Sequence, residues 1–112
     1  MPEKRIILEM GSGNDLHGGD YTKAAIRAVQ DALHHSSLTF LRTLGLDSRE
    51  MQVEVTIGAQ HPERVDAAAV KATLPHGTGT VTVVEGGLEI PNDAGTDSTV
   101  LAHACAIVRL DV

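Results

Sequence analysis

Aromatic residues are almost absent from this chain of 112 residues, which contains no Trp, one Phe and one Tyr. A core of this composition is built from Val, Ile, Leu and Ala, whose side chains each bury less apolar surface than an aromatic ring. The length fits a single domain, residues 1–112, with one modest core and no room for a separate cofactor domain. We therefore expect neighbouring copies of the chain to supply part of the apolar burial.

The chain also lacks the features of several protein classes. Its one cysteine, Cys105, excludes an intrachain disulfide framework, and the apolar alternation around it favours a buried thiol. The net charge is -6 with no cluster of Lys and Arg, whereas a nucleic-acid partner requires a basic surface. No apolar run reaches membrane-spanning length, and the polar N-terminus does not fit a signal peptide. We expect a cytoplasmic protein without nucleic-acid or membrane partners.

Glycine is concentrated in residues 11–20, which hold four glycines, two aspartates and a histidine. This segment follows an apolar, strand-like run at residues 5–10 and precedes a helical pattern. Glycines let a ligand approach the main chain, while Asp and His supply charge and proton transfer. We predict a loop that forms part of a ligand site, in which Asp15 and His17 have little structural role. A solvated turn that ends in a helix cap is the alternative.

Helical spacing of apolar residues begins directly after this segment. Asp20 is placed to cap a helix whose buried face is rich in Ala, over residues 21–34. A shorter helical pattern covers residues 38–44, and Asp66 is placed to cap a helix over residues 67–74.

Period-two alternation predicts the remaining elements, which are strands at residues 51–59, 80–88 and 99–112. With the strand at residues 5–10, the order is β-α-β-α-β-β. This order predicts an α/β (α+β) fold, with a four-stranded mixed sheet, helices on one face and the last two strands paired as a hairpin. The second face of the sheet is then left for another copy of the chain.

The loop residues suggest two kinds of chemistry. Asp15, His17 and Asp20 can form a general acid/base set in which one carboxylate orients the imidazole, although Asp20 also fits a helix cap. Asp15 and His17, with Glu9 and His61, could instead bind a divalent metal, but no motif with metal-ligand spacing supports this alternative.

Other candidate residues lie beyond the loop. Lys23 and Arg27 are one turn apart at the start of a helix, where the helix dipole also favours an anion; the alternative is a pair of solvated cations. His61 precedes Pro62 at the end of a strand, which fixes the direction of its imidazole. Glu85 precedes Gly86 and Gly87, a pair typical of a bulge with close backbone approach or of a strand end.

Three separated segments carry a family resemblance: DLHGGDYTKAAIRAV at residues 15–29, GAQHPERVD at residues 58–66 and VEGGL at residues 84–88. They resemble a small family of conserved hypothetical bacterial and fungal proteins that is named after an uncharacterised Listeria protein. The resemblance covers almost the whole chain and implies no particular activity.

The element order and the turn at residues 84–87 also resemble one repeat of the ring-opening amidohydrolases that cleave cyanuric acid and barbiturate. In those enzymes three repeats, each with a four-stranded sheet and helices, pack around a central barrel, so this resemblance implies a trimer. They place a nucleophilic Ser, activated by Lys, immediately before a Gly-Gly pair, whereas this chain has Glu85 there. Their Ser-Lys chemistry is therefore not carried over.

Two hypotheses follow. The first is a cofactor-independent hydrolase or isomerase that acts on a small anionic or cyclic amide metabolite, with no metal, in a pocket between subunits of a homo-oligomer, a trimer or a multiple of three. The second is a non-catalytic metabolite-binding or sensing protein that uses the same pocket. The expected catalytic residues are Asp15, His17, His61 and Glu85, and the expected ligand-binding residues are Glu9, Gly13, Gly18, Asp20, Lys23, Arg27, Gly86 and Gly87.

Overall fold

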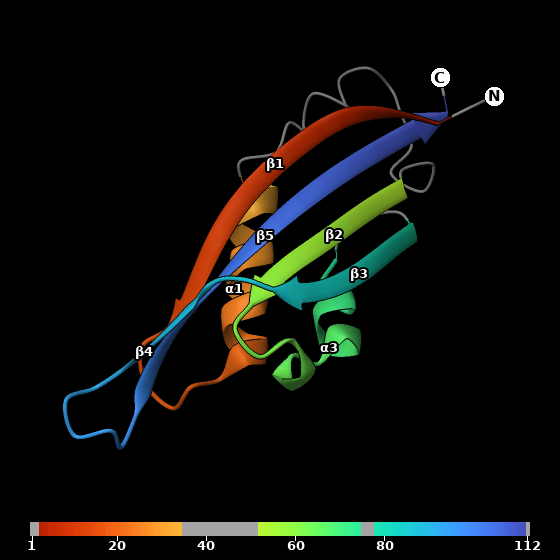
Figure 1. Cartoon of the computed structure of the whole chain (residues 1–112). Helices are drawn as coiled ribbons and strands as arrows, with labels where there is room; N and C mark the ends of the chain where they lie inside the picture. Colours follow the sequence, from red (N-terminus) through yellow and green to blue (C-terminus); the bar gives the residue numbers. More distant parts are fainter. Residues whose placement is uncertain (1–2, 35–51, 75–77, 112) are drawn as a thin grey trace.

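The computed structural model describes residues 3–34, 52–74 and 78–111, which form a mixed α/β fold (Figure 1). The expected helix at residues 38–44 lies outside the described residues. In chain order the elements are β1 (Glu3–Asp15), α1 (Tyr21–His34), β2 (Gln52–Ala59), the 3-10 helix η2 (Pro62–Arg64), α3 (Ala67–Lys71), β3 (Thr78–Glu85), β4 (Leu88–Pro91) and β5 (Ser98–Asp111). None of the helices in this described part of the chain is long and apolar enough to cross a membrane.

The strands form one mixed sheet in the order β1-β5-β2-β3, and β4 pairs with the start of β5. β5 is antiparallel to β1 and to β2, whereas β2 and β3 are parallel. The predicted number of four strands is wrong, because the pattern at residues 80–88 belongs to two strands. The chain leaves β3 at Glu85, crosses the end of β2 through Gly86 and Gly87, and pairs again as β4. The expected final hairpin is therefore β4 with β5.

β1 continues to Asp15, so the prediction of a loop over residues 11–20 is wrong in its first half. The reason is the close approach of α1 to this strand. A Cβ atom at Gly13 would lie 2.6 Å from the carbonyl oxygen of Ala24, and one at Gly11 would lie 2.7 Å from that of Ala28. Real Cβ atoms do not come so close to other backbone atoms, so these glycines let the helix lie directly on the strand.

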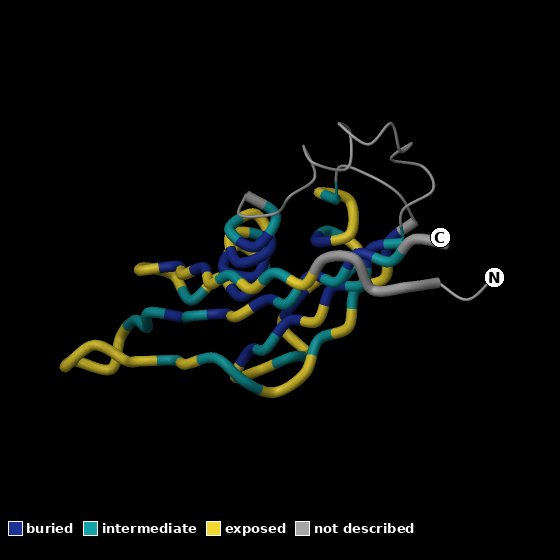
Figure 2. The backbone as a smooth tube through the Cα atoms, turned by 90° about the horizontal axis from the view of Figure 1, so that it is seen from above, coloured by how far each residue is buried: buried dark blue, intermediate teal, exposed yellow. Residues whose placement is uncertain are grey.

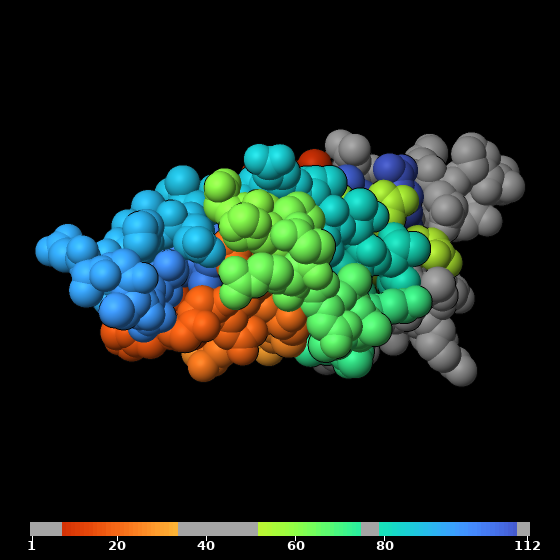
Figure 3. All heavy atoms as spheres, turned by 60° about the horizontal axis from the view of Figure 1, so that its bottom comes forward, coloured from red at the N-terminus to blue at the C-terminus, as the bar shows by residue number. Residues whose placement is uncertain are grey.

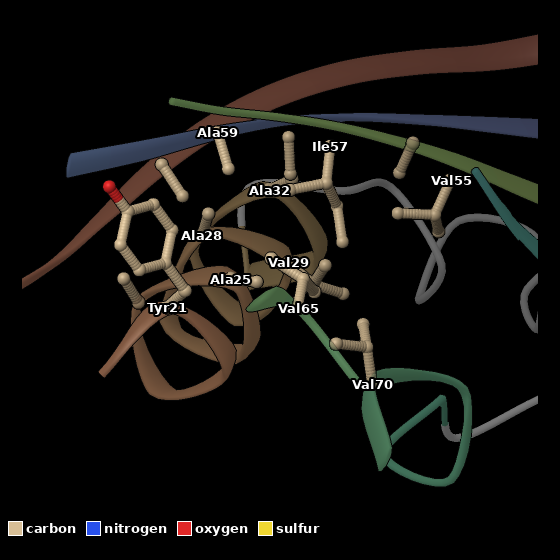
Figure 4. Packing of buried hydrophobic residues seen from close by; sticks show 14 of the residues in the cluster. Tyr21, Ala25, Ala28, Val29, Ala32, Val55, Ile57, Ala59, Val65 and Val70 are labelled. Atoms are coloured by element: carbon tan, nitrogen blue, oxygen red, sulfur yellow. The ribbon is translucent and has the colours of Figure 1, made fainter. Parts of the chain in front are cut away.

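The core lies between the sheet and the helices, and its side chains are small. The alternation predicted for β5 is confirmed from Val100 to Val108, where every second side chain is buried against the helices. Figure 4 shows Val29 of α1 and Val65 below Ile57 of β2. α1 contributes five fully buried residues to this core, which are Ala24, Ala25, Ala28, Val29 and Ala32.

The two faces of the sheet differ in what covers them. Figure 2 shows both helices on one side, and no helix among residues 3–34, 52–74 and 78–111 covers the other. We call this second surface the open face. In β5 it is formed by the odd-numbered residues 99–109. The residues that pair with them in β1, β2 and β4 belong to the same face, and so do the β3 residues that pair with these residues of β2.

Candidate functional site

A pocket beside the first turns of α1 brings together four of the predicted residues. Asp15, His17, Lys23 and Arg27 line a hollow of about 300 Å³ with Asn14 and Leu16. β1 supplies Asp15 at its last position, the following turn supplies His17, and α1 supplies the two cations. We call this hollow the Asp15 pocket.

Asp15 is the buried centre of this pocket, with only 4% of its surface exposed. Its Oδ2 atom accepts a hydrogen bond of 2.9 Å from the backbone N–H of Asp20. Its Oδ1 atom lies 3.7 Å from Nζ of Lys23 and 3.8 Å from a terminal nitrogen of Arg27. The expectation that Asp15 has little structural role is therefore wrong, because its carboxylate closes the turn between β1 and α1.

The start of α1 positions the two cations. The Oδ1 atom of Asp20 accepts a hydrogen bond of 3.0 Å from the backbone N–H of Lys23, so the predicted cap is confirmed. Arg27 donates a hydrogen bond of 2.7 Å to the carbonyl oxygen of Asn14, which ties its guanidinium to β1. The Lys23 and Arg27 side chains remain about half exposed.

His17 lies at the rim of the pocket and contacts a residue from the far end of the chain. Its Nδ1 atom is 3.5 Å from Oδ2 of Asp97 in the connection between β4 and β5. The Oδ1 atom of Asp97 accepts hydrogen bonds from the backbone N–H groups of Gly18, at 2.8 Å, and Ser98, at 2.9 Å. These two bonds, the Gly18 bond first, hold the pKa of Asp97 below its usual value, with a smaller contribution from His17.

This contact joins the turn after β1 to the β4–β5 connection, and Figure 3 shows the two segments side by side at one end of the molecule. The hydroxyl of Thr99 also donates a hydrogen bond of 3.2 Å to the carbonyl oxygen of Leu16. The sequence places Asp97 in a polar connection with no signal beyond turn formation. Its contacts with the turn after β1 could not be predicted from the sequence, because Gly18 and Asp97 are 79 positions apart.

Three of the predicted site residues, Glu9, His61 and Glu85, do not line the Asp15 pocket. Glu9 pairs with Ala106, six residues before Asp15 and therefore about 20 Å away along the strand. The imidazole of His61 packs edge-on against the ring of Tyr21, with a centroid distance of 5.7 Å. Glu85 is exposed at the last position of β3, opposite Ala59. The expectation that Glu9 lies at the end of its strand beside the loop is wrong, because β1 extends past it.

Three of the four glycines predicted to bind a ligand have evident packing contacts instead. Gly13 lies under α1, as described above. Gly86 donates a backbone hydrogen bond of 3.0 Å to Ala59, and the carbonyl oxygens of Gly86 and Gly87 accept hydrogen bonds from the side chain of Gln60. The pair thus carries the chain closely across the end of β2. Gly18 remains beside the pocket, where its N–H binds Asp97.

Sequence reasoning missed a second polar cluster, which surrounds Tyr21 at the start of α1. The Tyr21 hydroxyl donates a hydrogen bond to the Glu89 carboxylate, and the Arg64 guanidinium lies 4.6 Å from the centre of the ring. Burial, followed by the hydrogen bond to Glu89, raises the pKa of Tyr21 to about 12. The cluster gives no local motif, because its members come from three separate elements.

The metal alternative finds no support in this geometry. In the described ranges, no three His, Cys, Asp or Glu side chains lie close enough together to hold an ion. The four residues considered for that role, Glu9, Asp15, His17 and His61, are spread over different parts of the sheet and the turn.

Two comparisons with known proteins match the chain along nearly its whole length. A crystal structure described as an FtsZ-like protein of unknown function, from Nostoc punctiforme PCC 73102, is 36% identical, with a TM-score of 0.84. The alignment covers 100% of this chain and 99% of that one. No curated protein matches significantly. The model of a family described as conserved hypothetical protein matches residues 5–108, and the chain therefore belongs to this family, the Lin0512 family.

Proposed function

We propose that this protein binds a small anionic metabolite in the Asp15 pocket, with Lys23 and Arg27 as the anion clamp. The observation that carries the proposal is the position of these two cations around one buried carboxylate oxygen. Both lie 3.7–3.8 Å from Oδ1 of Asp15, which is beyond hydrogen-bonding distance, and both stay half exposed. Two positive charges face one negative charge, so the pocket is positive in a chain with a net charge of -6.

The clamp is held in place before a ligand arrives, which lowers the entropic cost of binding. Asp15 attracts both cations, and the bond from Arg27 to Asn14 ties down one nitrogen of the guanidinium. A guanidinium has five N–H donors in a planar fork, so others remain for a planar carboxylate. A volume of about 300 Å³ suits a small metabolite.

A second candidate function is catalysis on the same ligand, as a hydrolase or isomerase that uses no organic cofactor. The observation that favours it is the approach of Asp97 to Nδ1 of His17, since a carboxylate in that position orients an imidazole for proton transfer. In this role His17 carries the proton and Asp15 does not, because both oxygens of Asp15 already face donors or cations. A cyclic amide substrate belongs to this second candidate.

The test of binding is a set of thermal-shift and calorimetric titrations at low ionic strength with acetate, succinate, citrate and inorganic phosphate, with sodium chloride as the ionic-strength control. We expect a carboxylate to raise the melting temperature of the wild type by mass action. Lys23→Gln and Arg27→Gln should each lose this shift. Lys71→Gln is the matched control, because it removes an exposed cation from the end of α3. A carboxylate shift that persists in both clamp variants, or its absence from the wild type, contradicts the proposal.

The two candidate functions are separated by His17→Ala. If the protein only binds, this variant changes the affinity for the carboxylate little and the wild type leaves the bound compound chemically unchanged. If the protein is a hydrolase, the wild type opens the ring of a cyclic amide probe such as succinimide with uptake of one water, and His17→Ala binds the probe without conversion. Mass spectrometry of the incubated ligand reads out either result.

A further inference from the structure

The open face of the sheet collects the exposed apolar side chains of this protein. Six large apolar residues in the described part of the chain are exposed, and Leu16 in the turn is the one that lies elsewhere. The other five are Leu8, Met10, Val84, Leu88 and Ile90, all on the open face by strand register. Large apolar side chains gathered on one exposed face are a common mark of a protein interaction site, so a partner surface is indicated.

The middle of the open face is suited to receive side chains from another surface. Cys105 stands near its centre, opposite Met10 on one side and Thr56 on the other. These three residues line a largely apolar hollow of about 280 Å³. A hollow beside protruding side chains allows two such faces to interdigitate at the usual spacing of about 10 Å between packed sheets.

We propose that the open face packs against the open face of another copy of this chain. Charge is the first argument for a second copy. The formal charges among the described side chains of this face are Glu54 and Arg109, which pair with each other at 3.0 Å. Among the described side chains the face thus carries no excess of negative charge, while the chain carries -6, so two copies can meet here with their net charge directed outward. An anionic lipid surface would instead repel the acidic chain.

Area is the second argument. The face spans residues 99–109 along β5 and about four strands across, which corresponds to about 37 by 19 Å, or about 700 Å² on each copy. A stable interface of standard size buries about 800 Å² on each partner. The open face alone therefore nearly supplies the area that a lasting homo-oligomer needs.

Light scattering on charge-insertion variants tests this proposal. We expect the wild type to have a multiple of the 11.8 kDa chain mass, and Met10→Glu and Ile107→Glu to shift toward the single-chain mass. Both side chains point away from the helix-covered core, and circular dichroism checks that each variant is folded. Gln30→Glu is the matched control, because it adds the same charge at an exposed position of α1. A monomeric wild type, or an oligomer whose mass survives both substitutions, overturns the proposal.

The reactivity of the Cys105 thiol provides a second readout, which does not rely on the measured mass. It is half-buried in the single chain and lies in the middle of the proposed contact. We expect its reaction with a thiol reagent to be slow at high protein concentration and at least tenfold faster after dilution below the dissociation constant. A rate that is independent of concentration and unchanged in Ile107→Glu overturns the proposal. A mass of two chains fits this two-fold contact, whereas a mass of three chains, as the amidohydrolase resemblance implies, overturns the packing of open face on open face.

This inference does not depend on the proposed function. The buried carboxylate of Asp15 and the two cations of the pocket, Lys23 and Arg27, come from one chain and lie toward the helix side of the sheet, so ligand binding and self-association can fail separately.

Discussion

The two halves of residues 11–20 have similar compositions but use glycine for different physical reasons. Gly11 and Gly13 belong to β1, and their missing Cβ atoms make room for the backbone of α1. Gly18 and Gly19 lie in the turn, where their φ angles of 89° and 60° are in the left-handed region that favours glycine. Enrichment in glycine therefore does not by itself mark a ligand loop, because a helix lying closely on a strand produces the same composition.

Asp15 marks the boundary between these halves and connects them. It is the last residue of β1 and is buried there. Its carboxylate accepts a hydrogen bond from the backbone N–H of Asp20 and so closes the turn. We call residues 11–15 the strand half and residues 16–20 the turn half. The strand half is fixed by backbone packing, whereas the turn half is held by single polar contacts that water can replace. The strand half should therefore be far more sensitive to substitution.

The largest effect is expected from Gly13→Ala. The added methyl group would meet the backbone of α1 at 2.6 Å, so helix and strand must separate and the core between them loosens. We expect a loss of about 3 kcal/mol or more in the free energy of unfolding, measured by urea denaturation. Ser12→Ala in the same strand points to the open face and should cost less than about 0.5 kcal/mol. Similar costs for the two variants would refute the packing role of Gly13.

Asp15→Asn comes next, with an expected loss of about 2 kcal/mol. The amide still accepts the N–H of Asp20, but the two cations lose their buried negative partner. The control is Asp93→Asn, which removes a carboxylate from an exposed position in the β4–β5 connection. If both variants unfold at the same urea concentration, Asp15 is no more than a surface charge.

Gly18→Ala should cost about 1–2 kcal/mol, less than Gly13→Ala. Its Cβ atom would have open space, since the nearest neighbour is Oδ2 of Asp15 at 3.8 Å, and the cost comes from placing a side chain at a φ of 89°. Urea denaturation of the two alanine variants side by side measures the difference. A greater loss from Gly18→Ala than from Gly13→Ala would reverse the comparison between the two halves.

The smallest effect is a local response to acid. The N–H groups of Gly18 and Ser98 lower the pKa of Asp97, so its ionised form favours the folded contact. This contribution is fully present above the ordinary Asp pKa of about 3.9 and is lost as pH falls through the lowered value. We expect the amide NMR signal of Gly18 to follow this titration, while that of Gly13 in the β1–β5 ladder stays constant.

Asp97→Asn is the control for the acid response, because it removes the titrating group and should leave the Gly18 signal independent of pH in this range. Two results would contradict the separation of the two halves. One is a midpoint of the Gly18 amide titration at or above about pH 3.9 in the wild type, and the other is an equal change of the amide signals of Gly13 and Gly18 with pH.

The sequence predicted the elements whose signals are local. Asp20 and Asp66 were identified as helix caps because a cap bonds to a backbone N–H only three residues ahead. The pairing of Lys23 and Arg27 at one site followed from the helical repeat. The sequence analysis missed the division of residues 80–88 into β3 and β4. This division depends on the path of the chain across the end of β2 at Gly86 and Gly87, and the apolar alternation of residues 80–88 does not reveal that path.

The candidate site was likewise predicted only where its members are neighbours along the chain. Asp15, His17, Lys23 and Arg27 lie within 13 residues and do share a pocket. Glu9 was grouped with them because its strand was expected to end directly before the glycine-rich segment, but β1 is longer than its side-chain pattern indicates. Glycine has no side chain to extend an alternating pattern, so the end of that strand could not be found from periodicity.

The sequence by itself determined the helix faces, their caps and the buried face of β5, because periodicity and capping act between residues a few positions apart. The tertiary structure decided which glycines are strand residues, that Asp97 reaches His17, and that one face of the sheet has no helix over it among the described residues. Those outcomes depend on the order of strands in the sheet and on backbone contacts between distant segments. No local pattern of residues encodes them.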